Sequence, residues 1–367
     1  MRLRDLKLTN YRNCKDLELD LSSKKILIIG KNAQGKTNIL ESIYFLSTLK
    51  SPRAFNNIEL INFEAEKAEI NCNMIKAEID VELDFTYSRE KKRELALNKV
   101  KTTPKNFKSV LKTVLFSTAD LLLLRGNPSD RRDWLDRAIS QVYPAYDDRL
   151  SKYDKIRIQK NNLLKDYLKT GNSNDTLLDV YNEQLVVTGS NIIFLRKKYL
   201  KEIERIAQEK HRIISETENL KISYDCSFLA DENELKDIAA AFHKSLEERR
   251  VEEMRRGQAC VGPHRDDVIF YINNNEATKF ASQGQQRTLV LSLKLSELEI
   301  IREKTGYSPI LLLDDVLAEL DEVRQNYLLK SIEKDTQTII TSVDTILFED
   351  EFLKDVIIYK VDGGKIV

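Results

Sequence analysis

The sequence has few of the residues that define disulfide-rich or metal-binding proteins. Its 367 residues include four cysteines and three histidines. The spacing of the cysteines fits neither a zinc site nor a disulfide framework, so we expect reduced thiols, mostly in the core. These cysteines are Cys14, Cys72, Cys226 and Cys260.

Long apolar runs and an excess of one charge are also missing. No stretch approaches the roughly 20 apolar residues that cross a bilayer, and residues 1–10 lack the apolar core of a signal peptide. We therefore expect a cytoplasmic protein without a membrane partner. The 59 basic and 59 acidic residues cancel, so net charge neither favours nor excludes nucleic acid, because a neutral total can include a local basic face. A chain of this length suits about two domains.

The most informative segment is residues 30–37, which read GKNAQGKT. It follows the apolar run 26–29 and precedes a helix-prone stretch, which is the context of a phosphate-binding loop. In such a loop backbone N–H groups wrap a polyphosphate, Lys36 reaches the β and γ phosphates, and the Thr37 hydroxyl binds Mg²⁺. The implied ligand is a nucleoside triphosphate. The predicted contacts are Gly30, Lys31, Asn32, Ala33, Gln34, Gly35, Lys36, Thr37 and Asn38.

A second signal lies far downstream, where the apolar run 310–313 is followed by Asp314 and Asp315. This pattern predicts a buried strand that ends in two carboxylates. With a phosphate loop in the same chain, we expect Asp314 to contact Mg²⁺, partly through water, and Asp315 to orient the attacking water. By themselves the two aspartates have a simpler alternative, an acidic turn after a core strand.

The third signal is SQGQQR at residues 282–287, which opens a long predicted helix. Ser282 followed by Gln285 fits the capping box of an ordinary helix, and this alternative explains the residues taken alone. The order of phosphate loop, long insertion, serine-glycine helix start and double-aspartate strand nevertheless resembles ABC-type ATPases. That resemblance implies that Ser282, Gly284 and Gln285 contact the γ-phosphate held by a second chain, so that two chains enclose two ATP molecules. A helix N-terminus suits this role because its free N–H groups and dipole favour anions.

Within this superfamily the chain resembles the RecF family of bacterial recombination and repair ATPases from end to end. The segments that carry the resemblance are LKLTNYRN at 6–13, GKNAQGKTNILESI at 30–43, GNPSDRR at 126–132, GPHRDD at 262–267 and DDVLAELD at 314–321. Ala33 is a departure, because the family commonly has glycine there, although Gly30 and Gly35 remain. By likeness to related heads, Arg12 is expected to touch the nucleotide, a simple salt bridge being the alternative.

The resemblance implies an α/β fold, an ABC-type P-loop ATPase head of mixed sheets and helices with an inserted compact α-helical lid. Residue patterns agree, since the first third alternates as strands do and the pattern turns helical and highly charged from about residue 127. We predict head segments at 1–125 and 257–367 and the insertion at 126–256. At about 1.5 Å per helical residue, the helices of the insertion are too short for extended coiled-coil arms.

The function implied by the resemblance is that of a weak ATPase used as a switch. ATP and Mg²⁺ would drive formation of a homodimer that clamps duplex DNA near single-strand gaps. RecO and RecR are the implied partners, and RecA loading, SOS induction and recovery of stalled replication are the implied outcome. Clusters of basic residues at 91–93 and 131–132 are candidates for DNA contact, although a solvated charged face is the more common explanation. For residues 262–267 the resemblance offers no chemical role.

Two alternatives come from other functional classes. ABC transporter ATPases usually have glutamate where this chain has Asp315, and a histidine after the next strand, where residues 339–342 read IITS. A DNA-processing nuclease with a similar head is expected to carry a further carboxylate-rich domain, and the residues after Asp321 show no such composition. Both alternatives therefore fit the residues less well than a RecF-like protein.

Overall fold

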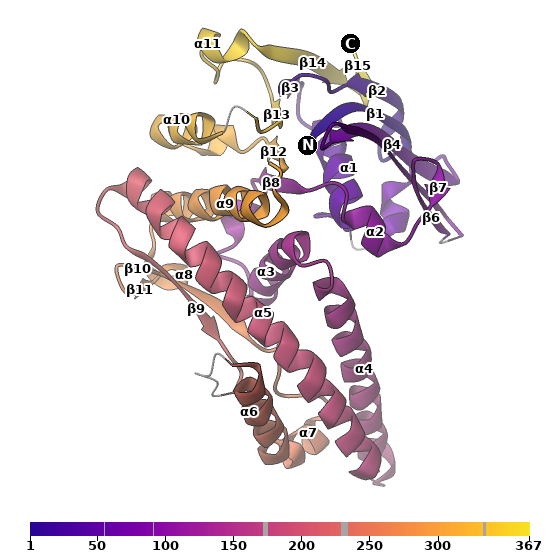
Figure 1. The fold of residues 1–367 in the computed structure, drawn as a ribbon, viewed down its shortest axis with the longest axis vertical. Coiled ribbons are helices and arrows are strands. Elements are labelled where there is room, and N and C mark those ends of the chain that lie inside the picture. The colour runs from indigo at the N-terminus through magenta and orange to yellow at the C-terminus, as the bar shows by residue number, and fades with distance from the viewer. Residues whose placement is uncertain (55, 91, 172–174, 229–233, 333–334) are drawn as a thin grey trace. The chain divides into compact units, whose positions relative to one another are not determined.

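A computed structural model describes all residues except 55, 91, 172–174, 229–233 and 333–334, and the described residues divide into two units (Figure 1). The first unit combines residues 1–122 with residues 287–367, and the second comprises residues 123–286. Both ends of the chain thus belong to one unit. The second boundary lies 30 residues later than the predicted one at 256/257, because a strand that follows it pairs with a strand of the insertion.

The first unit contains an antiparallel sheet with the strand order β2-β1-β4-β5-β6-β7. Alternate residues of these strands are buried, as expected where one face of a sheet covers a core. In β4 the buried set is Ala68, Ile70, Cys72 and Met74. The strands are β1 (Arg2–Tyr11), β2 (Cys14–Asp20), β4 (Lys67–Lys76), β5 (Ile79–Ser88), β6 (Arg93–Leu97) and β7 (Val100–Lys101).

A second sheet of this unit has the order β15-β14-β3-β13-β12-β8, and all its neighbours are parallel except β15. Its central strands read as continuous apolar runs, which is typical of parallel strands covered on both faces. The strands are β3 (Lys25–Ile29), β8 (Thr113–Ser117), β12 (Ile310–Asp314), β13 (Thr338–Ser342), β14 (Val356–Asp362) and β15 (Lys365–Ile366).

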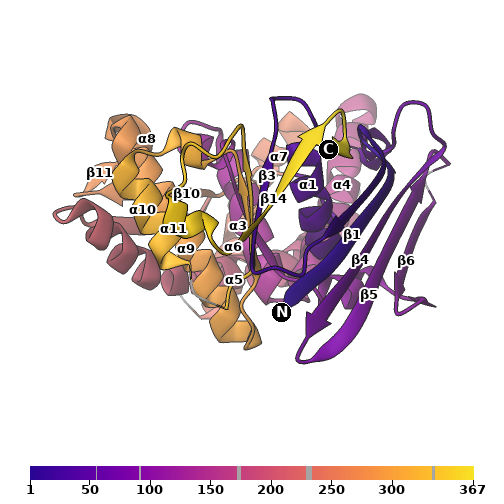
Figure 2. The same ribbon diagram turned by 90° about the horizontal axis from the view of Figure 1, so that it is seen from above.

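Helix α1 (Lys36–Thr48) lies between the two sheets of the first unit (Figure 2). Its apolar side chains share one hydrophobic core with residues of both sheets, so the helix that follows the phosphate loop is fixed from two sides. The remaining elements of this unit are η1 (Asn57–Leu60), α2 (Pro104–Lys108), η2 (Asp120–Leu122), η3 (Leu317–Glu319), α10 (Glu322–Ser331) and α11 (Asp350–Leu353). Helix α9 (Gln283–Thr305) begins in the second unit and continues into the first.

The second unit is mostly helical, with one three-stranded antiparallel sheet of order β11-β10-β9. Its longest helix, α5, has 41 residues and is on the order of 60 Å long. Helices α6 and α7 follow one another directly and meet at Arg249. The elements are α3 (Pro128–Val142), α4 (Tyr146–Thr170), α5 (Asp175–Ser215), β9 (Leu220–Asp225), α6 (Leu235–Glu248), α7 (Arg250–Arg256), β10 (Asp267–Ile272), β11 (Asn275–Glu276) and α8 (Ala277–Phe280).

Two buried ion pairs connect the helices of the second unit. Arg196 of α5 donates both Nε and Nη2 to Asp136 of α3, at 2.9 Å each. Lys160 of α4 is fully buried, and its Nζ lies 2.5 Å from Glu253 Oε2 of α7. Burial lowers the pKa of Lys160, and the Glu253 carboxylate opposes this shift. Each charge therefore depends on its partner, because an unpaired buried ion is costly.

None of the helices in the described residues combines the length and the apolar composition needed to cross a bilayer.

The pair between α4 and α7 gives a stability prediction. Lys160→Met removes the ammonium and leaves the Glu253 carboxylate buried without its partner, so we expect the free energy of unfolding to fall by about 3–5 kcal/mol. Denaturant unfolding followed by the fluorescence of Trp134 measures this loss, because Trp134 is the only tryptophan of the chain and is buried in α3.

Two further variants sharpen this test. Adding Glu253→Gln to Lys160→Met should recover part of the lost stability, since the amide oxygen can still accept from the Cys260 N–H, now 2.8 Å from Glu253 Oε1, without a buried charge. Lys155→Met changes an exposed lysine of the same helix and should alter stability by less than about 0.5 kcal/mol. Equal losses of unfolding free energy for Lys155→Met and Lys160→Met would contradict a stabilising role for the buried ion pair between Lys160 and Glu253.

Candidate nucleotide site

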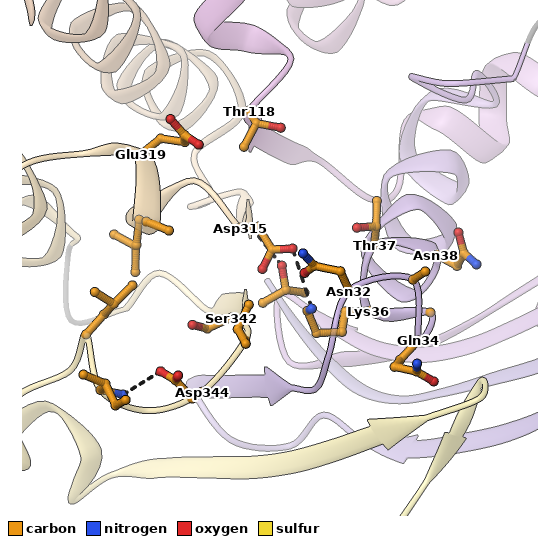
Figure 3. Close-up of a pocket in the computed structure, with 18 of the residues that line it drawn as sticks. Asn32, Gln34, Lys36, Thr37, Asn38, Thr118, Asp315, Glu319, Ser342 and Asp344 are labelled. Atoms are coloured by element: carbon orange, nitrogen blue, oxygen red, sulfur yellow. Dashed lines mark hydrogen bonds and ion pairs between the residues drawn. The ribbon is translucent and has the colours of Figure 1, made fainter.

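The first unit contains a cavity of about 770 Å³ at the carboxyl ends of its parallel strands (Figure 3). Residues 32–38 of the phosphate loop and α1 line one part, and residues 341–344, 346 and 347, at the end of β13 and just after it, line another. Other parts of the wall are formed by Asp315, Arg53 and Thr118. The carboxyl edge of a parallel sheet is where ligands of α/β proteins commonly bind.

The phosphate loop has two glycines at which no side chain fits. A Cβ at Gly30 would lie 2.4 Å from the Val361 carbonyl oxygen, and one at Gly35 would lie 2.8 Å from Asn13 Oδ1. Gly35 also has a left-handed φ of 113°. Asn13 holds the loop in place, because its Nδ2 donates to the Gln34 carbonyl at 3.2 Å.

Ala33, the departure from the family's glycine, has a left-handed φ of 66°. A residue with a Cβ adopts this conformation at a cost of roughly 1–2 kcal/mol, whereas glycine does not. Glycine would take this backbone conformation at lower cost, and alanine takes it here.

The structure brings the loop and the double-aspartate strand together. Thr37 Oγ1 donates to Asp314 Oδ1 at 2.9 Å, although the two residues are 277 positions apart. Lys36 is nearly buried, and its Nζ donates to the Gly30 carbonyl at 2.7 Å and lies 3.7 Å from Asp315 Oδ2. The four residues predicted to act in catalysis or metal binding therefore lie together. They are Lys36, Thr37, Asp314 and Asp315.

The oxygen atoms at this place fit a magnesium ion. A threonine hydroxyl and a carboxylate are the hard donors that Mg²⁺ prefers, and Thr37 and Asp314 present both side by side. Burial raises the pKa of Asp314, while hydrogen bonds from Thr37 and Thr341 oppose the shift. Asp315 Oδ1 is buried and has no hydrogen-bond partner among the described residues, so it can accept a bond from a bound water.

Thr341 organises both aspartates, a role that no sequence motif indicates. Its Oγ1 donates to Asp314 Oδ1 at 2.9 Å and accepts from the Asp315 N–H at 2.9 Å. The second bond fixes Asp315 with a left-handed φ of 51°, which an aspartate tolerates better than most residues. Only the strand register, which places Thr341 beside Asp314, would have identified it.

Arg12 forms the salt bridge that was the alternative to a nucleotide contact. Its Nε and Nη2 donate to the Glu41 carboxylate at 3.0 and 2.8 Å, and Arg12 does not line the cavity. The same carboxylate, only 1% exposed, accepts from Arg53 at 2.7 Å and from Ser51 at 2.5 Å. Arg53 does line the cavity and was missed, because it follows α1 without any motif.

Ser282, Gly284 and Gln285 lie at the start of α9, in the second unit. Here the capping box is present, since the Ser282 N–H donates to Gln285 Oε1 at 2.8 Å and the Gln285 N–H donates to Ser282 Oγ at 3.3 Å. The cap uses the hydroxyl of Ser282 only as an acceptor. Because Ser282 is exposed, its hydroxyl hydrogen can still donate to a ligand, so a cap and a phosphate contact are compatible.

Comparison with known proteins identifies the family. A family model described as the RecF/RecN/SMC N-terminal domain matches residues 2–366. The DNA replication and repair protein RecF of Bacillus subtilis (strain 168) is 37% identical over 369 residues, which is all of both chains. The chain belongs to the RecF family. RecF of Trichodesmium erythraeum (strain IMS101) is 40% identical over 384 residues, covering all of this chain and 98% of the relative.

Solved structures agree with this assignment. A structure of the recombination mediator protein RecF with ATP, in the RecFOR pathway, superposes with a TM-score of 0.91 at 32% identity and covers 100% of this chain and 97% of that one. An Smc head bound to the C-terminal winged-helix domain of ScpA has a TM-score of 0.55 at 15% identity and shares the fold. The predicted α/β head of the ABC type with a helical insertion is confirmed, and RecF membership replaces the transporter and nuclease alternatives.

The carboxylate shared by Arg12 and Arg53 gives a prediction with a pH dependence. Burial alone would raise the pKa of Glu41, but the hydrogen bonds from Arg12, Ser51 and Arg53 outweigh burial and lower it below its usual value of 4.5. A lowered carboxyl pKa stabilises the fold above the unfolded pKa, and this contribution is lost as pH falls through the folded pKa.

We therefore expect Glu41→Gln to destabilise the protein at pH 7 by roughly 1–3 kcal/mol. The difference from wild type should shrink as the pH falls below 4.5, because the Glu41 carboxyl is protonated first in the unfolded chain and, below its lowered pKa, in the folded chain as well. Melting temperatures of both proteins across this pH range measure the effect. Glu66→Gln, at an exposed carboxylate, is the control and should behave as wild type at every pH. A difference that is independent of pH would exclude the charge of Glu41 as its source.

Proposed function

We propose that this RecF-family chain is an ATP-dependent DNA-binding protein of recombinational repair and replication-fork recovery. The observation that carries the proposal is the convergence of Lys36, Thr37, Asp314 and Asp315 at one edge of the parallel sheet. Support also comes from full-length relatives named DNA replication and repair protein and from the related RecF structure described with ATP.

In this proposal the phosphate loop binds ATP. Its backbone N–H groups and Lys36 hold the phosphates, and Thr37 and Asp314 hold Mg²⁺, partly through water. The metal would neutralise charge on the β and γ phosphates. Asp315 orients the attacking water, for which its buried Oδ1 has a free acceptor site. Arg53 faces the same cavity, and Arg12 acts indirectly by sharing Glu41 with it.

The ATP state would be completed by a second copy of the chain. Ser282, Gly284 and Gln285 of that copy would contact the γ-phosphate, so that ATP closes a homodimer around duplex DNA near a single-strand gap. Slow hydrolysis would reopen the dimer, as suits a switch whose closed state must persist. The pathway named for the related structure supports RecO and RecR as partners, with RecA loading and SOS induction as the outcome.

The first test is fluorescence anisotropy of a labelled gapped duplex, titrated with the protein under ATP, ADP and no nucleotide. Tight binding is expected only with ATP and should be lost in Lys36→Met, because the phosphates lose their main cation. Lys24→Met removes an exposed lysine elsewhere in the first unit and should bind as wild type. DNA binding that is indifferent to nucleotide would contradict the proposed switch.

A second test separates the two roles of Ser282. Aspartate is as good an N-cap as serine, so Ser282→Asp should preserve the helix start while placing a negative charge where the γ-phosphate is expected. We expect this variant to bind ATP as a monomer but not to dimerise with a slowly hydrolysed ATP analogue in analytical ultracentrifugation. Ser282→Thr keeps the hydroxyl and should dimerise. If Ser282→Asp also dimerises, Ser282 serves only as a helix cap.

A further inference from the structure

The segment GPHRDD, residues 262–267, forms a tight turn in the second unit. Gly262 has a left-handed φ of 122°, and a Cβ there would lie 2.4 Å from Tyr153 Oη. The Arg265 N–H donates to the Gly262 carbonyl at 2.8 Å and closes the turn. The Pro263 carbonyl accepts from the buried guanidinium of Arg196 at 2.6 Å. Backbone geometry and buried contacts thus account for the start of the segment.

The two aspartates of the segment also hold the fold. Asp266 is buried and accepts from the Tyr224 hydroxyl at 2.5 Å and from the Ser227 N–H at 2.8 Å. Asp267 forms a two-bond ion pair with Arg131, at 2.8 and 2.7 Å. These contacts fix both carboxylates within the second unit, where neither is available to an external ligand.

His264 is held as a neutral ring. The Ala259 carbonyl can only accept a hydrogen bond, so His264 Nε2 carries the ring hydrogen and donates to it at 3.3 Å. The opposite nitrogen, Nδ1, therefore accepts from the Tyr153 hydroxyl at 2.7 Å. The pKa of His264 is lowered to about 3, first by burial, against the hydrogen bond to Ala259, and further by the charges of Arg157, Arg265 and Arg132.

Arg265 is the one side chain of the segment that these structural contacts leave exposed. It lines a cavity of about 440 Å³ in the second unit, together with Arg132 of α3 and Arg157 of α4. Asn161 and Gln258 add neutral hydrogen-bonding groups to the wall. Guanidinium groups from three separate parts of the chain therefore surround one small space.

Two of these arginines, Arg132 and Arg265, remain available to bind an anionic ligand. Arg132 Nη1 donates to the Asp266 carbonyl at 2.7 Å, and Arg265 Nη2 donates to the Ala259 carbonyl at 3.1 Å. Within the described part of the chain, neither has a carboxylate at ion-pair distance. A backbone carbonyl holds a guanidinium in position without neutralising it, and several of its N–H groups remain to donate.

The carboxylates on the cavity wall are engaged with other groups. Asp136 is neutralised by the buried Arg196, and Asp154 accepts from Arg157 at 3.0 and 3.2 Å. Asp133 is exposed and interacts with another group of the chain. Four arginines and three aspartates line the cavity, so its net charge is positive, and Arg132 and Arg265 are the two arginines without an ion pair among the described residues.

We propose that this cavity binds a phosphate group of a DNA strand, with Arg132 and Arg265 as its donors. Guanidinium groups match the tetrahedral oxygens of phosphate with paired hydrogen bonds, and a space of this volume suits one phosphate with part of its nucleotide. The choice of DNA as the source of the phosphate rests on the proposed function. The cavity gives the second unit a direct part in holding DNA, separate from the nucleotide site of the first unit.

The test measures how binding of a duplex under ATP depends on salt concentration. Arg265→Gln should weaken binding about tenfold, because one charge-assisted phosphate contact is lost. It should also reduce the slope of log affinity against log salt by about 1. Arg132→Gln/Arg265→Gln should lose more. Arg255→Gln/Arg256→Gln removes two charges from α7, outside the cavity wall, and is the matched control for this double variant.

Folding and charge are controlled separately. Because Arg132 holds the Asp266 carbonyl, its replacement could destabilise the fold, so the unfolding of each variant is followed by Trp134 fluorescence. If the double variant is unstable, the DNA affinity and salt dependence of the exposed single variant Arg265→Gln decide the test. Arg265→Lys keeps the charge and should retain most of the salt dependence. Equal affinities and slopes for Arg265→Gln and wild type would overturn the proposal.

A second arm distinguishes DNA from free phosphate. Inorganic phosphate is titrated into wild type and Arg265→Gln by calorimetry, without DNA. Phosphate binding that Arg265→Gln abolishes, while DNA binding stays as in wild type, would make the cavity a site for free phosphate and overturn the proposal. If wild type itself fails to bind DNA with ATP, the proposed function fails. If only the Arg265→Gln effect is missing, the cavity assignment fails alone.

Discussion

The hydrogen-bond register of the parallel strands β3, β13 and β12 determines where every group of the nucleotide site lies. β3 delivers the phosphate loop and β12 delivers Asp314, and β13 pairs with both, so the three strand ends meet at one edge. A slip of one residue would turn every side chain of a strand to the opposite face. The bond between Thr37 and Asp314 therefore depends on core packing across the whole first unit, where α1 shares one core with both sheets.

Within the second unit, buried ion pairs fix the arrangement of the helices more than sheet register does. Arg196 joins α5 to α3 and to the turn at residues 262–267, and Lys160 joins α4 to α7. Such pairs add little net stability compared with apolar packing, but they tolerate only one arrangement, since a displaced partner leaves a buried ion unpaired. This explains why a turn with left-handed glycine and two engaged aspartates presents a single exposed arginine at a defined place.

Local sequence patterns predicted much of this structure. The glycines and lysine of residues 30–37, the apolar run before Asp314 and the helices α4 and α5 all have signals within a short window of sequence. The roles of Thr341, Arg53 and Arg265 depend on contacts between residues distant in the chain, for which no periodicity exists. The same limit explains the boundary at residue 286, because pairing of β9 with β10 across about 40 residues assigns the later strand to the second unit.

Three residues at or beside the nucleotide site have a strained backbone. Arg12, Ala33 and Asp315 have φ values of 52°, 66° and 51°, in the left-handed region that side chains disfavour. Each such residue costs of order 1–3 kcal/mol and persists only where surrounding contacts fix it. The Thr341 bond fixes Asp315, and the Glu41 bonds fix Arg12. Stability from the two packed sheets is thus offset by strain that holds Asp315 in the cavity wall, with its Oδ1 buried and without a donor among the described residues. A water that attacks a phosphate needs a hydrogen-bond acceptor of this kind beside it.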